Sequence, residues 1–165
     1  MPHHVSRASL ADQAAFLEGG RSINVGSCDA EGRPSLSRAL GCRVSREEGR
    51  VTVFLARLQC EALLRDIAAR GRIAVVFSEP PTHRTLQLKG SDAEVVAIRD
   101  GDAAWVEGYV RAFAQELVPL GFIPEVIQAI FACPPSELAA VTFTPTDAFD
   151  QTPGPQAGAQ LEWGP

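Results

Sequence analysis

Hydrophobic and polar residues alternate with a period of two over several stretches of the chain, which is the pattern of half-buried β-strands. Short polar loops join the first three of these stretches, so an antiparallel meander is expected there. The whole set, of about six or seven strands, favours a small barrel with helices on its outside over a doubly wound parallel sheet. The predicted strands are residues 22–29, 35–44, 50–56, 72–79, 83–90, 91–100 and 138–145.

Four other segments repeat their apolar residues at helical spacing. Ser9 is a plausible N-cap for the first helix, and Gly71 ends the second. The third is expected to begin at Asp102, and its aromatic stripe marks a core or dimer-interface face. The predicted helices are residues 9–18, 58–70, 102–120 (ended by Gly121) and 124–131.

The predicted strand 35–44 carries an unexpected charge. Strict alternation places Arg38 on the same face as Leu36, Leu40, Cys42 and Val44, with Arg43 on the other. A guanidinium on an apolar face needs an anionic or carbonyl partner, because an unpaired buried charge is costly. The partner could be a ligand phosphate or a flavin carbonyl. It could also be an acidic residue such as Asp29 or Glu31, or Arg38 could be exposed at the mouth of an open barrel.

The crossing from the strand at 50–56 to the next helix is the second candidate site. Backbone N–H groups at a helix start bind anions, and Arg57 lies at this junction. Gln59 and Cys60 could bind a ligand there, and Cys60 is the thiol whose pKa a helix start could lower. Glu61 would instead repel a phosphate. A solvated turn is the alternative interpretation of Arg57.

Composition limits the possible functions. The chain has 165 residues, 45% of them hydrophobic, and a net charge of −5 with a pI near 5.2. These values are typical of one globular domain, expected over residues 1–150 with a Gly/Pro-rich tail at 151–165, and argue against nucleic-acid binding. No apolar run is long enough to span a bilayer and no signal-peptide core is present, so a cytoplasmic protein without a membrane partner is expected.

Motifs for metal binding or nucleophilic catalysis are missing. The cysteines are Cys28, Cys42, Cys60 and Cys133, and they have no zinc-like spacing. His3, His4 and His83 do not form a cluster in the sequence, and no metal site is expected. No catalytic-triad, Walker or dinucleotide-binding motif occurs.

The order of elements, with GRPSLSRALGCRV, VTVFLARLQCEALLRDIAARGRIAVVF and HRTLQLKGSDAEVV, resembles the pyridoxamine 5′-phosphate oxidase-like FMN-binding split-barrel family over roughly Ser22 to Val96. The resemblance implies a mainly β (α+β) fold, a six-stranded antiparallel split β-barrel with flanking helices. It also implies a homodimer with FMN bound at the dimer interface.

The family's functional positions match this chain only in part. Arg38 and Arg43 look like its paired basic residues, and Thr85 looks like its glutamine. Its flavin-lining pair matches Phe54 and Leu55 or, one residue later, Leu55 and Ala56. The family's Ser-Arg-Lys phosphate grip is replaced by Gln59, Cys60 and Glu61, and Arg57 could substitute for the missing lysine. The expected cofactor site therefore comprises Arg38, Arg43, Leu55, Ala56, Arg57, Gln59, Cys60 and Thr85.

The resemblance favours a flavin-dependent oxidoreductase acting on a small-molecule substrate or electron donor that the sequence does not identify. The alternative is a non-catalytic, dimeric flavin- or haem-binding module whose phosphate site has decayed. Glu61, where the family has a basic residue, is the feature that favours this alternative.

Overall fold

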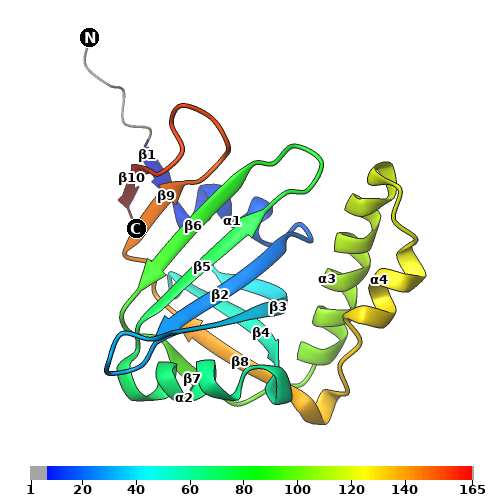
Figure 1. The fold of residues 1–165 in the computed structure, drawn as a ribbon, viewed down its shortest axis with the longest axis horizontal. Coiled ribbons are helices and arrows are strands. Elements are labelled where there is room, and N and C mark those ends of the chain that lie inside the picture. The colour runs from blue at the N-terminus through cyan, green and yellow to red at the C-terminus, as the bar shows by residue number, and fades with distance from the viewer. Residues whose placement is uncertain (1–6, 165) are drawn as a thin grey trace.

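A single antiparallel-rich sheet dominates the computed structural model, which describes residues 7–164 (Figure 1). Within these residues the sheet has ten strands in the order β1-β10-β9-β6-β5-β2-β3-β4-β8-β7. The strands are β1 (Arg7–Ser9), β2 (Ser22–Cys28), β3 (Pro34–Ser45), β4 (Arg50–Ala56), β5 (Ile73–Ser78), β6 (Thr85–Gly90), β7 (Glu94–Val96), β8 (Leu138–Phe143), β9 (Asp147–Asp150) and β10 (Ala159–Gly164). The helices are α1 (Leu10–Leu17), η1 (Arg57–Gln59), α2 (Glu61–Arg70), α3 (Asp102–Leu117), η2 (Val118–Leu120), α4 (Pro124–Ile130) and η3 (Pro135–Glu137).

The long strand β3 belongs to both halves of this sheet. Its first residues pair with β2, whereas its second half pairs with β4. The sheet bends around β3, and one group of side chains fills the space between its halves. This main core includes Ile23, Val25, Val53, Leu55, Val75, Phe77, Leu88, Val141 and Phe143, together with residues of α1 and α2. Burying each large apolar side chain in it contributes about 1.5–3 kcal/mol.

The expected α+β class is confirmed, but the expected six-stranded split β-barrel is not, because the sheet has ten strands in the described residues. The sheet of residues 7–164 is open, with β1 at one end and β7 at the other. The meander predicted for β2, β3 and β4 is present. The additional strands include β10, which lies in the predicted tail and pairs with β9 and β1.

An irregularity in β3 overturns the predicted alternation. The register with β4 shifts between Ala39 and Gly41, which is a β-bulge at Leu40. Because a bulge adds one residue, each later side chain of β3 points to the opposite sheet face from the one that strict alternation predicts. Ala39 and Cys42 therefore both reach the main core, and Arg38 shares the outer face with Arg43 rather than with Cys42.

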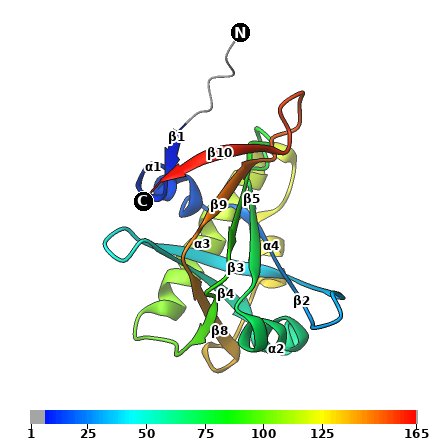
Figure 2. The ribbon, with the colours of Figure 1, turned by 90° about the vertical axis from the view of Figure 1, so that its left-hand side faces the viewer.

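A second layer covers the outer face of β3 and β4. Helices α3 and α4 lie together beside the sheet in Figure 1, and Figure 2 shows the same arrangement from the side. Gly41 permits this packing, because a β-carbon there would lie only 3.3 Å from the Tyr109 side chain of α3. The resulting second core consists of Leu40, Phe54, Val106, Val110, Phe113, Ala114, Leu117, Ile127, Phe131, Leu138 and Ala140.

Candidate functional site

A row of polar side chains crosses four strands at one end of the outer sheet face. Ser22 of β2 pairs with Ser78 of β5, and Ser78 pairs with Thr85 of β6. The Arg38 guanidinium of β3 donates to Ser22 Oγ at 3.0 Å, and the Thr85 and Ser78 hydroxyl oxygens are hydrogen-bonded to each other at 3.1 Å. We call Arg38, Ser22, Ser78 and Thr85 the polar row.

A cavity of about 440 Å³ lies along this row, between the sheet and the α3–α4 layer. We call it the row pocket. Arg38, Ser22, Ser78 and His83 line its sheet side. Its opposite wall is apolar and is formed by Phe113, Leu117, Leu120, Phe122, Ile127, Ile130 and Phe131. The pocket thus combines an apolar wall with a few directed polar groups, which is typical of small-molecule sites.

Arg38 is the charged group of the row pocket. Its guanidinium carbon lies 5.4 Å from the Phe131 ring centroid, a cation–π distance. Arg38 makes no ion pair with any residue in the range 7–164, and Asp29, which could have paired with it, binds Arg33 instead. The guanidinium therefore keeps most of its donor capacity for a ligand.

The Arg57 junction lies next to the row. Ala39 of β3 pairs with Leu55 of β4, so Arg38 on one strand and Arg57 beyond the other flank the same end of this pair. Arg57 and Gln59 are exposed on η1, and neither side chain has a polar partner in the described part of the chain. Both side chains therefore have free donors for an anion.

Arg43 is engaged elsewhere. Its guanidinium binds the Asp102 carboxylate at the start of α3, and Asp102 also accepts a hydrogen bond from Arg99 N at 2.9 Å. Asp102 is 1% exposed. A ligand anion at Arg43 would have to compete with this buried ion pair.

Leu55 and Cys60 point into the main core, whereas Ala56 contacts the second core on the outer side of the sheet. Of the two predicted flavin-lining residues, the structure brings only Ala56 to the outer face. The prediction of a lowered pKa for Cys60 is wrong. Burial raises the pKa of this thiol to about 11, and the nearby Arg57 opposes the shift only weakly.

Ser22, Ser78, His83 and Phe131 were not recognised as site residues from the sequence. His83 adopts φ 60°, the left-handed region that non-glycine residues rarely occupy, and its carbonyl accepts from Thr85 Oγ1 at 2.9 Å. The two serines do stand on outward positions of their strands, so alternation could have found them. Phe131 carries no comparable signal.

Residues 7–164 contain neither a metal cluster nor a membrane-spanning helix. No three His, Cys, Asp or Glu side chains in this range are arranged to hold a metal ion. None of its helices combines the length and the apolar character that crossing a membrane requires. His3 and His4 lie outside the described residues.

Neither a protein-family model nor a curated protein matches the sequence. Solved structures do match the fold. An F420 reductase is 14% identical with a TM-score of 0.52, over 81% of this chain and 93% of the other.

Two further matches have TM-scores below 0.5. A pyridoxamine 5′-phosphate oxidase-related, FMN-binding protein from Nostoc punctiforme is 14% identical with a TM-score of 0.46, over 89% of this chain and 82% of the other. A relative of general stress protein 26 from Clostridium acetobutylicum, of the pyridoxinephosphate oxidase family, is 16% identical with a TM-score of 0.49, over 84% of each chain. The resemblance seen in the sequence is confirmed as a likeness of fold alone, which rests on the match with a TM-score above 0.5.

Proposed function

We propose that this protein binds FMN along the polar row as a homodimer and is a flavin-dependent oxidoreductase. The observation that carries the proposal is Arg38, a guanidinium without an ion-pair partner among residues 7–164, at the side of an apolar-walled pocket. The FMN-binding protein among the similar structures agrees with this choice of cofactor.

The donor groups of the row fit such a cofactor. A flavin presents ring carbonyls and nitrogens at one end and a phosphate at the other. The row offers one guanidinium and three hydroxyls for the ring edge, and Arg57 offers a second guanidinium for the phosphate. Four strand spacings separate Thr85 on β6 from Ala56 on β4, which is about 19 Å and suits an elongated ligand.

The chemistry would be that of the cofactor, which supplies hydride or electron transfer when it is bound. The protein's part is to bind and orient. Arg38 and the hydroxyls hold the polar ring edge, while Arg57 and Gln59 hold the phosphate. The apolar wall with Phe113, Ile127 and Phe131 excludes water from one side of the pocket.

The proposed dimer uses the outer face of β6, β5 and β2 and of the first half of β3, around Leu36. Strands β6, β5 and β2 lie in the foreground of Figure 1 without a helix over them. Leu36 on this face is 71% exposed. A second copy placed here would cover Leu36 and close the polar row from the solvent side.

The cofactor is tested by titrating purified protein with FMN and with riboflavin, which lacks the phosphate, and following flavin fluorescence. We expect FMN to bind at least tenfold more tightly, because a charge-assisted contact contributes about 1.5–3 kcal/mol. Failure of FMN to bind at millimolar concentration would refute the proposal. Equal affinities for FMN and riboflavin would show that Arg57 and Gln59 do not bind the phosphate.

The alternative function, a non-catalytic flavin- or haem-binding module, is favoured by Glu61, which stands in the first turn of α2 where it repels phosphate. Anaerobic mixing of the FMN complex with NADH and NADPH separates the two. Bleaching of the flavin absorbance supports the oxidoreductase. If the flavin stays oxidised with both NADH and NADPH, the non-catalytic binding module is favoured.

A further inference from the structure

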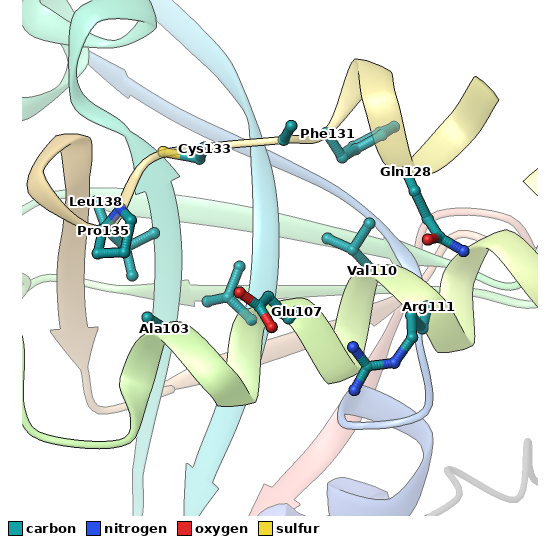
Figure 3. Close-up of a pocket in the computed structure, with 11 residues that line it drawn as sticks. Ala103, Glu107, Val110, Arg111, Gln128, Phe131, Cys133, Pro135 and Leu138 are labelled. Carbon is teal, nitrogen blue, oxygen red and sulfur yellow. The ribbon is translucent and has the colours of Figure 1, made fainter. Parts of the chain in front are cut away.

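A second cavity, distinct from the row pocket, lies between α3 and the segment that runs from α4 into β8 (Figure 3). Its volume is about 320 Å³. This is at the lower end of the range for small-molecule pockets, about 300–1,000 Å³, and suits a compact ligand better than a nucleotide. We call it the helix crevice.

The interior of the helix crevice is apolar. Val106 and Val110 of α3 line one side, and Phe131 and Leu138 line the other. All four side chains are buried and belong to the second core, so their positions are fixed by packing. The Phe131 ring also forms part of the row pocket, which places the two cavities on either side of it.

Three polar side chains stand around this apolar interior. Glu107 and Arg111 come from successive turns of α3, and Gln128 faces them from α4 (Figure 3). An acidic residue four positions before a basic one normally favours an ion pair on a helix. Here no such pair forms between Glu107 and Arg111, and neither makes an ion pair elsewhere in residues 7–164.

The Arg111 side chain instead folds back over its own helix. A β-carbon at Gly108 would lie 3.8 Å from Arg111 Nη2. Gly108 does not line the crevice, so the Arg111 guanidinium, whose side chain is among the lining residues, must turn from this position toward α4 to contact a ligand. Within the described chain Gln128 makes no hydrogen bond through its carboxamide. A negative, a positive and a neutral polar group with free bonding capacity thus surround one apolar cavity.

We propose that the helix crevice binds a small zwitterion, an α-amino acid with an apolar side chain. Its carboxylate pairs with the Arg111 guanidinium and accepts from the Gln128 amide, while its ammonium donates to Glu107. Its side chain packs on Val106, Val110 and Phe131. A simple carboxylate would be repelled by Glu107, and a simple amine by Arg111, so the two charges together select a ligand that carries both.

This site does not depend on the proposed flavin site and is tested without added cofactor. Calorimetric titration of the full chain would use L-leucine and L-phenylalanine. The matched probes are 3-methylbutylamine, which is leucine without its carboxylate, and 4-methylpentanoate, which is leucine without its ammonium. We expect each single-charge probe to bind about tenfold more weakly than leucine or worse.

Variants assign the binding to this cavity. Arg111→Gln and Glu107→Gln should each weaken leucine binding about tenfold. Glu125→Gln, an exposed carboxylate on α4 outside the crevice, is the matched control and should change nothing. Because all three positions are exposed, these variants are expected to fold.

Protection of Cys133, which lines the crevice, gives an independent measurement. Leucine should slow its alkylation by iodoacetamide, followed by mass spectrometry of the Cys133 peptide, without changing the rate at Cys28. The proposal is overturned if neither amino acid binds at tens of millimolar. It is equally overturned if 4-methylpentanoate binds as well as leucine, or if binding survives Arg111→Gln.

Discussion

Arg38 and Arg43 lie on the same strand and the same outer face, five residues apart, yet their surroundings differ completely. Each guanidinium lies 5.4 Å from a phenylalanine ring, Phe131 for Arg38 and Phe54 for Arg43. Arg43 also has a buried carboxylate, Asp102, whereas Arg38 has one serine hydroxyl. An acidic partner on a distant helix thus determines which arginine stabilises the fold and which remains available to a ligand.

The bulge at Leu40 puts both arginines on one face, and loss of the Leu40 side chain is expected to have the largest effect. Ala39 and Gly41 pair with successive residues of β4, so deleting Leu40 should leave both arginines facing outward while removing a buried side chain of the second core. We expect Leu40→Ala, which keeps the bulge, to cost about 2–5 kcal/mol. Urea unfolding followed by circular dichroism measures the loss. Deletion of Leu40 should cost at least as much, and a loss near zero in either variant would contradict the packing of Leu40.

Arg43→Ala tests the stabilising side of the comparison. It leaves the Asp102 carboxylate, 1% exposed, without its cation. Removing one partner of a buried pair costs about 3–5 kcal/mol, and we expect about 3 because the Arg43 side chain is 28% exposed. Arg38→Ala in the same urea experiment should change the free energy of unfolding by less than about 0.5 kcal/mol. Equal losses in the free energy of unfolding would contradict the assignment of Arg43 to stability and of Arg38 to ligand binding.

Arg38→Ala tests the binding side. We expect FMN affinity to fall by about 1.5–3 kcal/mol, and Arg57→Ala to lower the affinity for FMN but not for riboflavin. Arg72→Ala is the control, since Arg72 is an exposed arginine that lines a separate pocket at the other end of the same sheet face. Fluorescence titration provides all three values. If Arg72→Ala lowers FMN affinity as much as Arg38→Ala does, the contribution of Arg38 is general electrostatic attraction and not a specific contact.

Leu36→Glu probes the dimer that would enclose Arg38. A charge on the uncovered sheet face should shift the protein to monomer in sedimentation velocity and weaken FMN binding with it. Ile123→Glu introduces the same charge at another exposed apolar position, 61% exposed between η2 and α4. If the protein stays dimeric with Leu36→Glu but becomes monomeric with Ile123→Glu, the dimer interface lies on the α3–α4 layer instead of the sheet face.

Phe131→Leu should have the smallest effect. It removes the aromatic face beneath Arg38 while keeping the wall apolar. A cation–π contact at an exposed site contributes about 0.5–1 kcal/mol, and FMN affinity should fall by that amount. Phe131→Tyr retains the ring face and should bind FMN normally. A loss in both variants would indicate that the shape of the wall matters rather than its aromatic character.

Much of the fold could be predicted from the spacing of apolar residues and from the Gly and Pro residues that end helices and strands. The bounds of β4, the start of α3 at Asp102 and the end of α2 at Gly71 agree with the sequence because these signals are local. The bulge at Leu40 left no local signal, so the alternation beyond it was assigned to the wrong face. The strand β10 was missed because its Gly- and Pro-rich surroundings suggest a coil, and its pairing comes from distant β9 and β1.

The candidate site was only partly accessible to sequence reasoning. Arg38 and Thr85 do lie on one row, as the resemblance implied, because both positions follow from strand alternation near a turn. The engagement of Arg43 could not be foreseen, since Asp102 is 59 residues away. Cys60 looked reactive beside a helix start, but its side chain turns inward, and burial outweighs that effect on its pKa.

The parallel pairing of β1 with β10 has a mechanical consequence. Arg7 lies opposite Glu162 and Ser9 opposite Gly164, so the two strands run in the same direction. Tension applied between residues 7 and 164 would pull one strand backward and the other forward. Their hydrogen bonds would then be loaded together in shear rather than broken one after another. The short β1–β10 pair would therefore resist extension of the chain.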